Sequence, residues 1–142
     1  MASFTLRRTP KPPRPRRVIV VEDDAMLGTL LRETLIESGF DHVEVCPSTA
    51  CTLGKLRDGS FDAIVLDGHL ADTDEGWGLA ELVSALAEEN TRIVFQTGTP
   101  EEIPLHVRSL GQVLTKPYDP RELVEALMQK PRPGLLALLR GA

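Results

Sequence analysis

The sequence predicts an α/β fold in which a five-stranded parallel sheet carries helices on both faces. Short runs of β-branched and other apolar residues recur along the chain, and they are continuous, as is typical of strands buried on both faces. Segments with apolar residues at helical spacing lie between these runs. Strands that alternate with helices in this way indicate parallel strands joined by crossover helices.

The first strand and helix are predicted between residues 17 and 39. Residues 18–21 are all β-branched, which predicts a strand over 17–21. Asp24 is suited to cap the following helix, and Gly39 is suited to end it. The helix has four leucines on one face: Leu27, Leu30, Leu31 and Leu35.

The next units repeat this order. Residues 41–46 are predicted to form a second strand, and Ser48 opens a helix that ends at the turn of Asp58 and Gly59. The apolar run 61–66 predicts a third strand, which places Asp67 at its carboxyl end.

The remaining strands and the last helix follow a loop over residues 68–78. A third helix has four apolar residues on one face: Leu79, Leu82, Val83 and Leu86. Strands are predicted over 92–96 and 113–115. The last helix begins at an N-cap, Asp119, with proline at the first helical position and glutamate at the third, and it ends before Pro131.

The fourth crossover is predicted to be irregular. Residues 99–102 have the pattern of a helix start with a capping box, but Pro104 follows only five residues after the cap. Proline lacks a backbone donor and moves Ile103 away from helical dihedral angles. We therefore expect a single helical turn or an irregular loop here.

Five strands and about five helices match the flavodoxin-like, doubly wound architecture, with strand order 2-1-3-4-5 and a shortened or irregular fourth helix. Residues 17–130 are expected to form this domain. Residues 1–16 are predicted to be a disordered, basic, proline-rich arm, and residues 131–142 a short apolar tail.

Composition narrows the class of protein. The chain of 142 residues is long enough for one domain with a core, and its longest apolar run, residues 18–21, is too short to cross a bilayer. Without an apolar export segment, we expect a cytoplasmic protein in which Cys46 and Cys51 are reduced thiols. We expect a monomer or a weak dimer.

The net charge of −5 is unevenly distributed. Residues 1–17 contain six basic residues and no acid, so residues 18–142 carry a charge of −11. A basic arm can attract nucleic acid, but Phe4 is its only aromatic residue, and bases need aromatic rings on which to stack. We therefore favour a solvated tail and do not expect nucleic-acid binding.

Polar residues follow the predicted strands at the edge where an open α/β sheet binds ligands. They are Glu22, Asp23 and Asp24 after the first strand, Asp67 after the third, Thr97 after the fourth and Lys116 after the fifth. Clustered carboxylates repel one another, and Mg²⁺ prefers such oxygen ligands. Asp67 could then attack phosphorus as a nucleophile, with Lys116 and Thr97 stabilising the charge. Taken alone, the acidic run 22–24 is equally compatible with a solvated helix N-terminus.

Four segments of the sequence resemble the receiver domains of bacterial two-component response regulators. They are Val-Ile-Val-Val-Glu-Asp-Asp (18–24), Phe-Asp-Ala-Ile-Val-Leu-Asp (61–67), Val-Phe-Gln-Thr-Gly (94–98) and Leu-Thr-Lys-Pro-Tyr (114–118). The resemblance extends over about residues 17–129. The Phe-x-Thr-Gly segment is similar to that of stand-alone alphaproteobacterial receivers.

The resemblance implies a role for each matching residue. Asp67 would be the phosphorylated aspartate, Thr97 the switch hydroxyl, and Lys116 the lysine that binds the phosphoryl group, followed by a cis proline. Mg²⁺ would be held by Glu22, Asp23, Asp67 and the backbone carbonyl of His69. The phosphoryl donor would be a sensor histidine kinase or a phosphotransfer protein.

The sequence also departs from the family pattern. Ala71 stands where receivers usually have proline, the usual loop glycine is displaced to Gly76, and Val113 replaces an aromatic switch residue. These departures and the short fourth helix put the usual coupling between threonine and aromatic residue in doubt.

The expected function is that of a phospho-accepting signalling module. Residues 130–142 are too few for an output domain, so we expect an unknown protein partner to provide the output. The alternative is a receiver-like interaction module that works without phosphorylation. An Asp-nucleophile phosphohydrolase is disfavoured because His69, not a second aspartate, stands two residues after Asp67. We therefore do not expect an enzyme.

Overall fold

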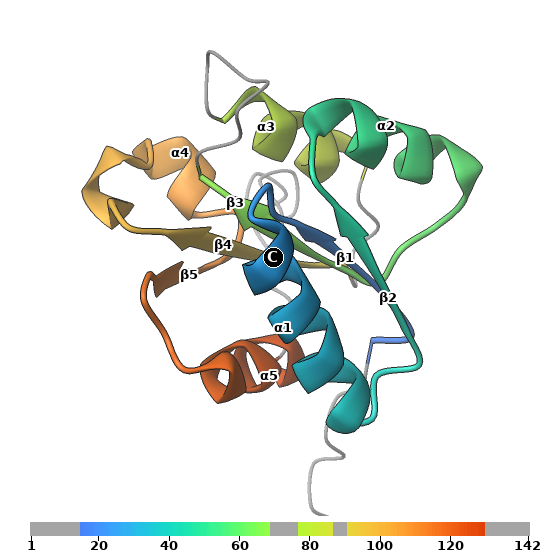
Figure 1. The fold of residues 1–142 in the computed structure, drawn as a ribbon. Helices are drawn as coiled ribbons and strands as arrows, with labels where there is room; N and C mark the ends of the chain where they lie inside the picture. Colours follow the sequence, from blue (N-terminus) through green and yellow to red (C-terminus); the bar gives the residue numbers. More distant parts are fainter. Residues whose placement is uncertain (1–14, 69–76, 87–90, 130–142) are drawn as a thin grey trace, which may run out of the picture.

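A computed structural model describes residues 15–68, 77–86 and 91–129 of the chain. Its five strands are all parallel and lie in the order β2-β1-β3-β4-β5, as the sequence predicts (Figure 1). The strands are β1 (Arg17–Val21), β2 (His42–Cys46), β3 (Ala63–Asp67), β4 (Arg92–Thr97) and β5 (Gln112–Thr115).

Helices cover both faces of the sheet. They are α1 (Ala25–Glu37), α2 (Thr49–Asp58), α3 (Gly78–Leu86), α4 (Leu105–Arg108) and α5 (Pro120–Met128), with a 3₁₀ turn, η1, at Pro100–Glu102. Helices α1 and α5 lie on one face, and α2, α3 and α4 lie on the other (Figure 1). This is the doubly wound arrangement.

The core has two halves because successive side chains of a strand point to opposite faces. In β1, Val18 and Val20 pack toward α1 and α5, whereas Ile19 and Val21 pack toward α2, α3 and α4. All four side chains are fully buried. The continuous apolar run of residues 18–21 therefore contributes side chains to both halves of the core.

The predicted helix starts are present for three helices. Asp24 accepts hydrogen bonds from the backbone of Met26 and Leu27, and Ser48 accepts one from Cys51. At α5 the full capping box forms between Asp119 and Glu122. These caps fix where each helix leaves the carboxyl end of its strand.

The apolar faces of two helices are narrower than predicted. Leu30 in α1 and Leu82 and Leu86 in α3 are exposed. Smaller neighbours, Gly28 and Ala80, take up the buried positions instead. A small residue lets the helix approach the sheet closely, so fewer large side chains fit beneath it.

The fourth crossover is short, as predicted. The turn η1 is followed by Pro104 and then by the single turn of α4. The predicted capping box at Thr99 is wrong, because the Thr99 side chain makes no cap hydrogen bond and donates to the Glu102 carboxylate at 3.0 Å. In the 3₁₀ turn the backbone nitrogen of Glu102, at the third position, donates to the carbonyl oxygen of Thr99 at 3.0 Å and not to its side chain.

Candidate functional site

Parallel pairing brings the polar strand ends together at one edge of the sheet. Val21 is in register with Leu66 in the neighbouring strand, so Glu22 follows β1 beside Asp67 at the end of β3. Thr97 ends β4 in register with Thr115 of β5, and Lys116 comes next. The strand order therefore places residues that are far apart in sequence side by side.

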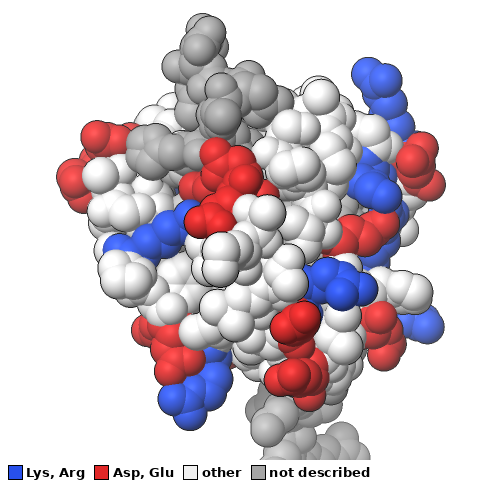
Figure 2. Space-filling view, viewed as in Figure 1, with Lys and Arg blue, Asp and Glu red and all other residues white. Residues whose placement is uncertain are grey.

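Three carboxylates and one ammonium group meet at this edge. Lys116 Nζ lies 2.8 Å from Glu22 Oε1 and 3.3 Å from Asp67 Oδ2. Carboxylate oxygens of Glu22, Asp23 and Asp67 all lie within 4.8 Å of one another. We call these four residues the acidic pocket. Figure 2 shows acidic side chains gathered over the start of α1, with a basic side chain beside them.

Burial differs sharply within the acidic pocket. Glu22 is 1% exposed and Asp67 is 6% exposed, whereas Asp23 is open to solvent. A buried carboxylate must be hydrogen-bonded or paired. A partner that approaches from solvent would meet Asp23 first.

The carboxylate of Glu22 is held by donors on both of its oxygens. Oε2 accepts from the backbone nitrogen of Asp24 at 3.2 Å. Oε1 accepts from Lys116 Nζ at 2.8 Å and from Gln96 Nε2 at 3.3 Å. Glu22 is therefore fixed in one orientation.

The charges of the acidic pocket shift each other's proton affinity. Burial and the neighbouring Asp67 raise the pKa of Glu22 above its ordinary value, against the Lys116 ammonium, which lowers it. Burial tends to lower the pKa of Lys116, but the hydrogen bond that its ammonium donates to Glu22 and the charge of Asp67 outweigh burial and raise it. The lysine is therefore charged at neutral pH, while the carboxylates remain crowded.

The residues fit a hard divalent cation. Mg²⁺ takes oxygen ligands, is held by one or two carboxylates, and keeps water molecules in its shell. The three carboxylates supply such oxygens, and a cation would relieve the repulsion between them.

Thr97 lies beside the acidic pocket on the other face of the sheet. Its hydroxyl accepts a hydrogen bond from Thr99 N at 3.1 Å and lies 3.4 Å from Thr99 Oγ1. The residue after Asp67 lies against it: a Cβ added at Gly68 would come within 3.0 Å of Thr97 Oγ1 and 2.9 Å of Trp77 Cη2. Trp77 packs edge-on against Phe95, with ring centroids 5.7 Å apart.

Two polar residues in this region were not assigned a role from the sequence. Gln96 is fully buried and donates to Glu22, and the Tyr118 hydroxyl donates to Gln96 Oε1. The signal was an amide within the otherwise apolar end of β4, since a buried polar side chain needs partners. Burial, and then the charges of Glu22 and Asp67, raise the pKa of Tyr118.

Other predicted features have mixed outcomes. The peptide bond between Lys116 and Pro117 is cis, as the resemblance implied. Cys46 and Cys51 are free thiols. His69, Ala71 and Gly76 lie outside the described residues.

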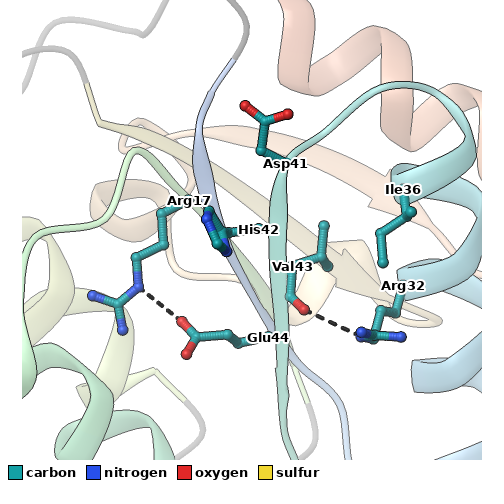
Figure 3. A pocket seen from close by; sticks show the side chains of 7 residues that line it. All are labelled: Arg17, Arg32, Ile36, Asp41, His42, Val43 and Glu44. Carbon is teal, nitrogen blue, oxygen red and sulfur yellow. Dashed lines mark hydrogen bonds and ion pairs between the residues drawn. The ribbon is translucent and has the colours of Figure 1, made fainter.

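A separate hollow of about 370 Å³ lies at the edge strand β2, at the end of that strand away from the acidic pocket. Figure 3 shows the side chains that line it: Arg17, Arg32, Ile36, Asp41, His42, Val43 and Glu44. Both of its arginines already have a hydrogen-bond partner. Arg17 contacts Glu44 at 2.8 Å, and Arg32 Nε donates to the carbonyl oxygen of Val43 at 3.3 Å.

Within residues 15–68, 77–86 and 91–129, none of the helices has both the length and the apolar character required to span a bilayer.

Comparison with known proteins gives a consistent result. The family model for the response regulator receiver domain matches residues 18–128. The chain is 30% identical over 115 residues to the transcriptional regulatory protein PcoR of Escherichia coli, and the match covers 77% of this chain and 48% of PcoR. It is 31% identical over 121 residues to the transcriptional regulatory protein RprY of Bacteroides fragilis, covering 82% of this chain and 50% of RprY. The chain thus spans about half the length of these curated relatives.

Among solved structures, the fold is similar to that of a CheY-like response regulator receiver domain from Methylobacillus flagellatus. The TM-score is 0.68 at 23% identity, and the match covers 79% of this chain and 98% of that one. At this identity the likeness concerns the fold.

Proposed function

The chain belongs to the response regulator receiver domain family, and from this premise we propose that it accepts a phosphoryl group on Asp67. Receiver domains are signalling modules of two-component systems. The observation that carries the proposal is the Lys116 ammonium, which contacts Glu22 and Asp67 at once beside the carboxylate of Asp23.

The proposed chemistry assigns one task to each residue. A carboxylate oxygen of Asp67 forms a bond to phosphorus as the bond between phosphorus and the donor breaks. Lys116 is close enough to Asp67, at 3.3 Å, to neutralise charge on the transferred group. Thr97 would exchange its bond with Thr99 for one to the phosphoryl group.

The acidic pocket would also hold the magnesium ion. Glu22, Asp23 and Asp67 would be its ligands, with Asp23 the more direct member of the pair that follows β1. The ion would supply positive charge to the oxygens of the transferring phosphoryl group.

The donor and the output are also part of the proposal. A phosphohistidine on a sensor histidine kinase or a phosphotransfer protein fits as donor, because Asp23 is exposed to solvent at this edge of the sheet. The output would be a protein partner that distinguishes the phosphorylated form from the unphosphorylated one.

The test is phosphorylation by a small-molecule donor. We expect incubation with Mg²⁺ and acetyl phosphate or phosphoramidate to give a phosphoprotein, and Asp67→Asn to abolish it. Asp58→Asn, at the exposed end of α2, is the matched control and should be labelled like the wild type. If EDTA in the incubation prevents labelling, this result would support the role of the metal ion.

The opposite results would separate the alternatives. Mg²⁺ binding without any label would favour a phosphorylation-independent interaction module. Equal labelling of wild type and Asp67→Asn would contradict the proposed acceptor.

A further inference from the structure

A buried amide connects the acidic pocket to Tyr118, in the loop between β5 and α5. Gln96 is 0% exposed and precedes Thr97 in β4. Its Nε2 donates to Glu22 Oε1 at 3.3 Å, and its Oε1 accepts from the Tyr118 hydroxyl. Both ends of the amide therefore have a partner.

The chemistry of the partners fixes the direction of this chain. An ionised carboxylate only accepts hydrogen bonds, so the amide must present its NH₂ group to Glu22. A phenol, with an ordinary pKa of about 10, keeps its proton at neutral pH and donates to the amide oxygen. An amide has one donor end and one acceptor end, which are what these two neighbours need.

The amide also affects how Lys116 is shared. Glu22 Oε1 accepts a hydrogen bond from Lys116 Nζ at 2.8 Å, and the same ammonium lies 3.3 Å from Asp67 Oδ2. Without the Gln96 donor, Oε1 would depend on Lys116 alone. The carboxylate could then turn toward the lysine and draw it away from Asp67.

We propose that Gln96 is a positioning residue that orients the Glu22 carboxylate for cation binding, and that Tyr118 holds the amide in place. This inference rests on the proposed function, since it concerns the same acidic pocket. Gln96 touches neither the reacting oxygen nor the cation, and it acts through Glu22.

The inference is tested with Gln96→Met, which keeps the length of the side chain and removes its hydrogen bonds. The dissociation constant of Mg²⁺ is measured by calorimetry and by the fluorescence of Trp77, the only tryptophan. We expect Gln96→Met to weaken Mg²⁺ binding about tenfold, because residues that orient metal ligands have effects of this order. Tyr118→Phe should weaken it in the same direction, but less.

Gln112→Met is the matched control. Gln112 is a glutamine too, but only partly buried, and its Nε2 donates one hydrogen bond, at 3.3 Å, to the backbone of α5. It should lower stability without changing the Mg²⁺ affinity. Thermal unfolding in EDTA shows whether each variant is folded, and Tyr118→Phe keeps the test decisive if Gln96→Met does not fold.

A second readout distinguishes positioning from chemistry. At saturating Mg²⁺, the rate of phosphorylation of Gln96→Met by acetyl phosphate should return to that of the wild type. An unchanged Mg²⁺ affinity in both variants, or a rate that stays low at saturating Mg²⁺, would overturn the inference and leave the proposed function intact. If Asp67→Asn bound Mg²⁺ as tightly as the wild-type protein, the proposed function and the inference would both fail.

Discussion

Gly68 shows how closely single residues are packed at the acidic pocket. It follows Asp67 directly, and its position next to Thr97 and Trp77 leaves no room for a side chain. Any atom added there must displace the hydroxyl of Thr97 or the indole ring.

We therefore predict that Gly68→Ala impairs phosphorylation and lowers stability. The new Cβ would lie 2.9 Å from Trp77 Cη2 and 3.0 Å from Thr97 Oγ1, and overpacking of this kind costs about 1–3 kcal/mol. The free energy of unfolding and the emission spectrum of Trp77 would measure the effect.

Gly78→Ala is the control for this substitution. Nothing lies within 4 Å of a Cβ added at Gly78, at the start of α3. A wild-type labelling rate in Gly68→Ala would contradict the close packing described here.

At the residue scale, the sequence predicts the charged members of the acidic pocket but not their support. Glu22, Asp67 and Lys116 were predictable because the carboxyl ends of parallel strands must meet. Gln96 and Tyr118 were not, because their contact depends on which face of β4 the amide points to and on the path of the chain after Pro117. Neither feature has a local sequence signal.

At the scale of elements, α2 contains a glycine that its surroundings do not require. Gly54 is exposed in the middle of the helix, and a Cβ there would meet nothing within 4 Å. Glycine lowers helix stability because it loses the most backbone freedom on folding.

Gly54→Ala should accordingly raise the free energy of unfolding by about 0.5–1 kcal/mol. Urea unfolding followed by circular dichroism would measure the gain. Gly28→Ala in α1 is the matched comparison, since its Cβ would lie 2.9 Å from Val45 Cγ1. An equal gain at both positions would show that packing against β2 is looser than the structure indicates.

The elements themselves were largely predictable. Caps and glycine stops marked the ends of α1, α2 and α5, and Gly39 does adopt a positive φ of 97°. The exposure of Leu30, Leu82 and Leu86 could not be predicted, because helical periodicity defines a face but not how near the helix lies to the sheet. The geometry of η1 was not predictable, because Thr99 and Pro100 favour a helix start whereas Pro104 opposes a continuing helix. Sequence rules for helix ends do not say which preference prevails.

At the scale of the whole molecule, the proposed binding of a cation at the acidic pocket would be coupled to folding. The carboxylates of the pocket come from the end of β3 and from the two residues after β1, and they meet only when the sheet is formed. A ligand that binds the folded chain alone stabilises it by mass action.

Mg²⁺ at about 100 times its dissociation constant should therefore raise the free energy of unfolding by about 2.7 kcal/mol. The gain should disappear in Asp67→Asn and on addition of EDTA. Urea titrations followed by the fluorescence of Trp77 would measure it. Sodium chloride of equal ionic strength serves as the control, and an equal gain in that salt would show that charge screening, not a specific site, is responsible.

Arg32, at the edge of the sheet, affects how the molecule can associate with other copies of itself. β2 has strand β1 on one side only, and its outward carbonyl at Val43 is already engaged by Arg32. Exposed strand edges are templates for aggregation, and charged side chains blunt them. A second chain that tried to extend this sheet would meet an occupied acceptor and a cation at Val43, which disfavours edge-to-edge pairing of two sheets in concentrated solution.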